Sequence, residues 1–239
     1  MNTAQLTVKP PRAVLEGVYA FPPNRSTLGG TAYFIVENAV QNDRLSGGGI
    51  AEKASNLLID CPTWTDAYAD FMAEQGGVRW LVLTHRGGFS QVKDWQARFD
   101  CEVVMQEQEA YLLPGVAVTS FCDRTHLGPD TQVLWTPGHS PGSACVYIPR
   151  HGGVLFTGRH LLPNRQGQPV PLRLSKTFHW PRQLRSVQKL LDTFSPETLT
   201  HICPGASTGF LRGQPTIERA YTQLQSLDLA ALRQAPAGP

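Results

Sequence analysis

Two histidines stand where an apolar run of the chain gives way to a glycine-rich stretch. His85 ends the run VRWLVLTH at residues 78–85 and is followed by RGGF, and His139 lies in the loop WTPGHSPG. Imidazole nitrogens bind divalent metals, and a catalytic zinc ion typically takes three protein ligands and lowers the pKa of its bound water to about 7. The chemistry open to these histidines therefore depends on which further ligands the fold brings beside them.

The elements that must position these histidines alternate between strands and helices. The run at 78–85 is apolar throughout, which is typical of a strand covered on both faces. Further β-rich runs predict strands at 31–39, 54–62, 101–106, the start of 132–142 and 199–205, and a hairpin over 143–158. Helical spacing of apolar residues predicts helices at 65–77, 90–99, 180–194 and 215–233. No linker divides the chain, so we predict one α/β domain.

The composition is that of a soluble globular protein. The chain has 239 residues, of which 41% are hydrophobic and 17% charged, and its net charge of +2 favours no class of partner. No apolar run approaches the roughly 20 residues of a membrane-spanning helix, and MNTAQLTVKPPRAV lacks the apolar core of a signal peptide. The five cysteines are scattered and form no CxxC pair, which indicates reduced thiols and a cytoplasmic location.

Five motifs in order resemble those of the metallo-β-lactamase superfamily. They are LLIDCP, LVLTH, WTPGHSPGSACVYI, GGVLFTGRHLL and HICPGAS, and the resemblance spans about residues 17–210. It implies a four-layer αββα sandwich with its active site along one edge. We place this single domain at 17–233, after an N-terminal extension at 1–16 and before a disordered tail at 234–239.

The resemblance implies seven metal-ligand positions, and this chain keeps two of them. His85 corresponds to the first histidine of the HxHxDH loop, and His139 is the histidine of TPGH. The other five positions hold Gly87, Phe89, Ser90, Arg159 and Ala206. Arg159 replaces the aspartate that bridges two metals, and its permanently charged guanidinium repels a cation there. We therefore expect no dinuclear zinc and no other cofactor, with His85 and His139 as residual ligand candidates.

A second alignment leads to the same expectation. Some branches of the superfamily carry a carboxylate-rich loop in place of HxHxDH. Gly87 and Gly88 stand where those branches have Asp-Asp. The missing ligands therefore do not depend on which branch is the template.

Other residues near the implied site have more than one interpretation. Asp60 corresponds to a carboxylate that orients a ligand and is expected to pair with His85 or Arg159. The two imidazoles are also explained by stability alone. Cys61 and Cys203 are more simply buried thiols than nucleophiles. An alternative metal site drawn from His85, His139, His160, His179 and one cysteine has no supporting spacing.

The charges are unevenly distributed. From Arg150 to Lys189 the chain has eight Lys or Arg residues and no Asp or Glu. Such a run usually marks a solvated face, but the proline-punctuated loop at 160–181 would border the implied site and attract an anion or an acidic surface. No RNA-binding motif accompanies Phe178 and Trp180, so nucleic acid is not the expected partner.

These observations predict a non-hydrolytic pseudoenzyme that binds an anionic ligand or an acidic protein partner, either as a monomer or as a homodimer. The predicted catalytic set is His85, His139 and Arg159. The predicted ligand-binding set is Asp60, Ser90, Arg159, His160, Arg173, Lys176 and His179. One alternative is a hydrolase of an ester, thioester or phosphoester with a single weakly bound zinc or other divalent metal. Another is a purely structural subunit of a larger assembly.

Overall fold

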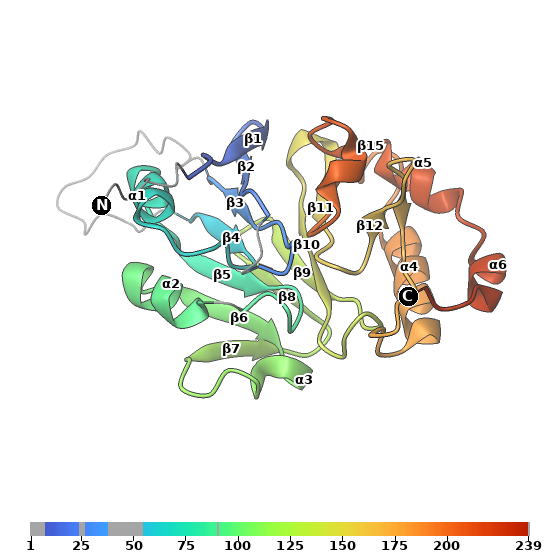
Figure 1. Cartoon of the computed structure of the whole chain (residues 1–239), viewed down its shortest axis with the longest axis horizontal. Coiled ribbons are helices and arrows are strands. Elements are labelled where there is room, and N and C mark those ends of the chain that lie inside the picture. Colours follow the sequence, from blue (N-terminus) through green and yellow to red (C-terminus); the bar gives the residue numbers. More distant parts are fainter. Residues whose placement is uncertain (1–7, 24–26, 38–54, 90, 239) are drawn as a thin grey trace, which may run out of the picture.

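Two β-sheets packed face to face form the centre of the molecule, and helices cover the outer face of each (Figure 1). The computed structural model describes residues 8–23, 27–37, 55–89 and 91–238. The first sheet has the order β1 (Arg12–Leu15), β2 (Val18–Ala20), β3 (Tyr33–Ile35), β4 (Leu57–Ile59), β5 (Trp80–Leu83), β6 (Glu102–Gln106), β7 (Val118–Phe121). The second has the order β15 (Ile217–Glu218), β14 (His201–Cys203), β11 (Val154–Phe156), β10 (Ala144–Ile148), β9 (Thr131–Trp135), β8 (Arg124–Leu127).

Strand direction places several loops at one edge of this sandwich. Strands β4, β5, β6 and β7 are parallel, and in the second sheet β11 is parallel to β14 and antiparallel to β10. The carboxyl ends of parallel neighbours lie on the same side of a sheet. The loops after β4, β5, β11 and β14 carry Asp60, His85, Arg159 and Ala206.

Alternate side chains of each strand contribute to different layers of the core, because successive side chains of a strand point to opposite faces of the sheet. Leu57 and Ile59 of β4 join the cluster between the two sheets, whereas Leu58 joins the cluster under α1 (Asp66–Glu74) and α2 (Val92–Phe99). The outer face of the second sheet packs in the same way against α4 (Trp180–Thr193) and α5 (Ala220–Gln225). The four-layer αββα sandwich predicted from the sequence is confirmed.

Most predicted elements are present, including a buried strand, β5, within the run at 78–85 and the antiparallel hairpin of β10 and β11. The predicted helix at 215–233 is wrong. Ile217 pairs with Ile202 at the sheet edge, and the chain then forms α5 and a separate α6 (Leu229–Gln234). Arg219, at φ +49°, interrupts helical geometry between the strand and α5.

Some elements had no counterpart in the sequence analysis. They are β1, β2, β7, β8 and α3 (Glu107–Ala110), and the small hairpin β12 (Leu162–Pro163) and β13 (Pro169–Val170) inside the expected loop at 160–181. At the two ends, β1, which lies in the expected N-terminal extension, pairs with β2 of the expected domain, and the Gly238 amide donates to the Arg173 carbonyl. The domain boundaries stay a prediction. No helix in the described part of the chain is long and apolar enough to span a bilayer.

Candidate functional site

A chain of hydrogen bonds links the ends of β4 and β5. Buried Asp60, in the left-handed region at φ +56°, accepts from the Thr84 amide at 2.8 Å and from the Thr84 hydroxyl at 2.6 Å. The Thr84 oxygen also lies 3.0 Å from His85 Nδ1. The Thr84 hydroxyl has one proton and donates it in the hydrogen bond to Asp60. The hydrogen bond between Thr84 and His85 therefore needs its proton on His85 Nδ1, with the Thr84 oxygen as acceptor. The Nε2 atom of His85 is then an unprotonated acceptor, buried and without a partner among the described residues.

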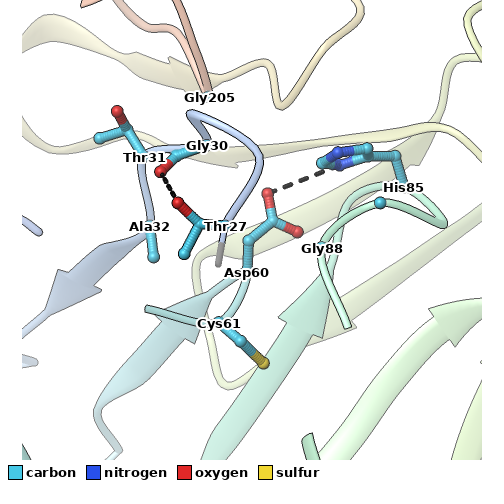
Figure 2. Close-up of a pocket in the computed structure, with 10 residues that line it drawn as sticks. Thr27, Gly30, Thr31, Ala32, Asp60, Cys61, His85, Gly88 and Gly205 are labelled. Atoms are coloured by element: carbon cyan, nitrogen blue, oxygen red, sulfur yellow. Dashed lines mark hydrogen bonds and ion pairs between the residues drawn. The ribbon is translucent and has the colours of Figure 1, made fainter. Parts of the chain in front are cut away.

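Figure 2 shows Asp60 and His85 lying beside one another at the ends of their strands. Their Oδ2 and Nδ1 atoms are 3.8 Å apart. The predicted pairing of Asp60 with His85 is therefore indirect and passes mainly through Thr84. Thr84 was missed in the sequence analysis, although it directly precedes His85 in LVLTH.

A second histidine faces His85. The rings of His85 and His139 have centroids 5.9 Å apart and an interplanar angle of 68°. His160, which is buried, has no hydrogen-bond partner on either ring nitrogen within the described residues. Its carbonyl accepts from the Gln183 side chain at 3.0 Å, and Gln183 Oε1 is itself buried without a partner. Nothing in the helical pattern of 180–194 distinguished Gln183 from a solvent-facing residue.

The electrostatics of this cluster favour neutral imidazoles. The pKa values of His85, His139 and His160 are each lowered to about 3, mainly by burial, and the guanidinium of Arg159 contributes to the shift of the first two. Burial raises the pKa of Asp60 to about 6, against the opposing hydrogen bonds from Thr84 and the charge of Arg159. At pH 7 the cluster therefore has one buried carboxylate, three neutral rings and one guanidinium.

Arg159 holds a loop across the site. Its Nη2 donates to the Leu28 carbonyl at 2.8 Å, while its Nε is buried without a partner among the described residues. Residues 27–31, here called the covering loop, are also fixed to the end of β14: the Thr31 amide donates to Gly205 O at 2.8 Å, and Gly30 forms an antiparallel bridge with Ala206. No sequence pattern indicated this loop.

The covering loop leaves little space beneath it. It encloses a cavity with Asp60, His85 and the glycines Gly87, Gly88 and Gly205 (Figure 2). The volume of this cavity is about 10 Å³. That is room for about one water molecule.

The remaining predicted residues lie in different settings. Arg173 donates to the Ala235 carbonyl near the C-terminus, and Lys176 is exposed. The backbone amide of His179 donates to Gly138 O, next to His139. Its ring caps α4 by accepting a hydrogen bond from the Arg182 amide. Ser90 lies outside the described residues. The structure thus brings together Asp60, His85, His139, Arg159 and His160.

The basic segment from Arg150 to Lys189 does not form a single surface. Arg150 pairs with Glu37, and Lys189 pairs with Asp123. Trp180, one of the two aromatic residues named in this segment, is buried, and its indole donates to Leu232 O. Cationic residues that are close in the sequence therefore contact different parts of the fold.

Solved structures with the same architecture cover most of this chain. The BLEG-1 B3 metallo-beta-lactamase matches with a TM-score of 0.59 at 17% identity, over 85% of this chain and 95% of that one. The chain has the metallo-β-lactamase fold. ETHE1 from Myxococcus xanthus matches with a TM-score of 0.60 at 20% identity, over 87% and 83% of the two chains. A metallo-beta-lactamase from Staphylococcus aureus subsp. aureus COL matches with a TM-score of 0.62 at 17% identity, over 93% of this chain and 68% of that one.

Those identities establish the metallo-β-lactamase fold and nothing finer. No protein-family model and no curated protein matches this sequence at a significant level. The chemistry of this metallo-β-lactamase-fold protein must therefore be argued from its own residues.

The side chains present do not fit a dinuclear metal centre. In the described ranges, no three His, Cys, Asp or Glu side chains are placed to hold one ion. A Cβ added at Gly88 would lie 2.6 Å from Asp60 Oδ1, and one at Gly87 would lie 3.0 Å from His85 Nε2. A ligand side chain at Gly88 would require Asp60 to move, and one at Gly87 would require a small shift of His85. At the last ligand position, Ala206 is buried against the covering loop.

Proposed function

We propose that this metallo-β-lactamase-fold protein is a non-hydrolytic binder of a small anion, held at Arg159 and the surrounding imidazoles. The observation that carries the proposal is a group of buried polar atoms with no partner in the described residues. They are Arg159 Nε, His85 Nε2, both ring nitrogens of His160 and Gln183 Oε1. Buried polar atoms nearly always have a protein, water or ligand partner.

The charge of the cluster selects the sign of the ligand. Arg159 is the permanent charge of the group, and the neutral rings add donors and acceptors without adding charge. Asp60 is already engaged by Thr84 on both carboxylate oxygens. An anion gains charge-assisted hydrogen bonds from a guanidinium, whereas a divalent cation meets repulsion from it.

The limited space under the covering loop restricts the size of the ligand. The cavity beneath it holds about one water molecule and excludes a bulky ester substrate. Arg159 does not line this cavity, so a small oxyanion would bind at the guanidinium beside the covering loop and not beneath it.

Thermal unfolding at fixed ionic strength tests the proposal, with phosphate, sulfate or acetate replacing chloride. A ligand that binds only the folded state stabilises it by about 2.7 kcal/mol at a hundred times its Kd. We expect at least one oxyanion to raise the Tm of the wild type and of Arg233→Met, an exposed arginine on α6. Arg159→Met should abolish the rise. Equal responses in both variants would contradict the proposal.

The rival function is a hydrolase with one weakly held metal, and one observation favours it. His85 Nε2 is unpartnered and, by the assignment above, unprotonated, as a metal ligand must be. This function requires hydrolysis of an ester, thioester or phosphoester that zinc stimulates and His139→Ala abolishes. Such activity would replace the binding proposal.

A further inference from the structure

An open groove lies at the edge of the sandwich where the two sheets part. It has a volume of about 430 Å³, within the range of small-molecule sites. One wall comes from β1, β2 and β3, and the other from the segment between β14 and β15, including Thr208 and Pro215. These elements face one another at the top of the view in Figure 1.

The floor of the groove is apolar. Val14 and Phe21, both buried, and half-buried Ala20 form its base. Four prolines complete the apolar lining, namely Pro10, Pro22, Pro23 and Pro215. Proline rings add apolar surface without a backbone N–H to satisfy. This surface suits an unbranched alkyl chain.

The charged side chains that line the groove are all cationic. Lys9 and Arg12 are exposed, and among the residues that the structure describes no Asp or Glu lines the groove. The Tyr68 hydroxyl donates to the Lys9 carbonyl at 2.8 Å, which fixes the chain at this point.

One buried polar atom at the groove has no partner in the described residues. Thr31 lines the groove, and its hydroxyl is buried and unsatisfied. In Figure 2 its side chain points away from Asp60 and His85. The groove therefore offers two cations, one free hydroxyl and a continuous apolar floor.

We propose that the groove binds an amphipathic anion, an unbranched alkyl carboxylate whose chain lies on the apolar floor and whose carboxylate pairs with Lys9 and Arg12. The charge complementarity of the rim selects a carboxylate over an alcohol or an ammonium head group. This site shares Thr31 with the covering loop, but it does not depend on the function proposed for the Arg159 cluster.

Titration calorimetry on the full chain tests the groove with octanoate, nonanoate and decanoate below their micellar concentrations. Each added methylene that is buried should tighten binding about fourfold. Decanol and decyltrimethylammonium, which have the same chain, should bind at least about tenfold more weakly than decanoate. Equal binding of all three head groups, or no decanoate binding, would overturn the proposal.

Variants separate the two parts of the site. The double change Lys9→Gln, Arg12→Gln should weaken decanoate binding at least about tenfold and leave decanol unchanged. Ala20→Phe should fill the floor and abolish binding with the charges intact. Lys93→Gln, an exposed lysine on α2 outside the groove, is the matched control and should bind as the wild type does.

The oligomeric state provides a further check. A dimer in sedimentation that Ala20→Phe dissociates would identify the groove as a subunit interface and overturn the proposal. A monomer that binds decanoate through Lys9 and Arg12 would support it.

Discussion

The Arg159 guanidinium donates a hydrogen bond to the Leu28 carbonyl, with 2.8 Å between Nη2 and the oxygen. By the resemblance to the superfamily, Arg159 stands where an aspartate would bridge two metals. The substitution therefore introduces a positive charge and also gives that position a new bonding partner in the covering loop. On the same resemblance, Ala206 stands at the position of a ligand histidine, and it pairs with Gly30. Two positions that the resemblance assigns to metal ligands thus contact the same loop.

Arg159→Met should loosen the covering loop without unfolding the protein. The Thr31 amide, bonded to Gly205 O, should exchange with solvent about tenfold faster, because a hydrogen bond from a charged donor contributes about 1 kcal/mol or more to closing the loop. Hydrogen exchange measured by NMR or mass spectrometry checks this. The matched control is Arg150→Met, which loses a guanidinium bond to Val36 O and should leave Thr31 exchange unchanged. Unchanged exchange in Arg159→Met would show that the anchor is not needed.

Gly88→Ala should destabilise the fold, because the new methyl would lie 2.6 Å from Asp60 Oδ1 in a buried site. Overpacking of this kind costs about 2 kcal/mol in the free energy of unfolding. The control is Gly209→Ala, at a position with no atom within 4 Å of the added Cβ, where we expect a change within about 0.5 kcal/mol. Urea denaturation of both variants measures the difference. Equal stabilities would mean that Asp60 moves freely and does not define this loop.

The stability should depend steeply on pH. His85, His139 and His160 have a folded pKa of about 3, below the ordinary 6.5, so between pH 4 and 6 each takes up a proton on unfolding. Asp60, whose folded pKa is raised to about 6 from 3.8, releases one in the same window. The net uptake of about two protons makes the free energy of unfolding fall as the pH falls, by about 2.7 kcal/mol per pH unit.

Two variants test this sign from opposite directions. His160→Gln removes one imidazole and should reduce the slope by about one proton, whereas Asp60→Asn removes the opposing group and should increase it by about one. Denaturant titrations from pH 4.5 to 7 give the slopes. A wild-type slope near zero would show that the imidazoles accept protons in the folded state.

Returning a carboxylate to the site should return metal affinity. Arg159→Asp removes the repelling charge and adds a third ligand to His85 and His139, the number that zinc needs from a protein. We expect zinc affinity at least about tenfold above that of the wild type, measured by calorimetry with zinc alone. Arg233→Asp adds the same carboxylate on α6 and should leave zinc affinity at the wild-type level. The same weak zinc binding in both variants would mean that the site lacks metal for reasons other than Arg159.

The sequence predicted the parts of the structure that depend on repeated local patterns. The apolar run at 78–85 identified a strand buried on both faces, since Leu81 and Leu83 face the helices while Trp80 and Val82 face the other sheet. The order of motifs identified the fold and brought Asp60, His85, His139 and Arg159 to one edge.

Contacts between distant segments were not predictable in the same way. The bond from Arg159 to Leu28 joins residues more than a hundred positions apart, and nothing near Leu28 in the sequence marks a partner. The break in the helix expected at 215–233 is similar. Ile217 has helical spacing with its neighbours, but pairing with Ile202 at the sheet edge overrides that local preference.

The metal content of the purified wild-type protein tests the central claim most directly, namely that Arg159 and Ala206 have replaced a metal centre with an anchored loop. The protein would be expressed with added zinc, iron and manganese, dialysed, and analysed by mass spectrometry for each element. The account predicts less than about one ion per ten chains. A content near one ion per chain that His85→Gln or His139→Gln abolishes would contradict it.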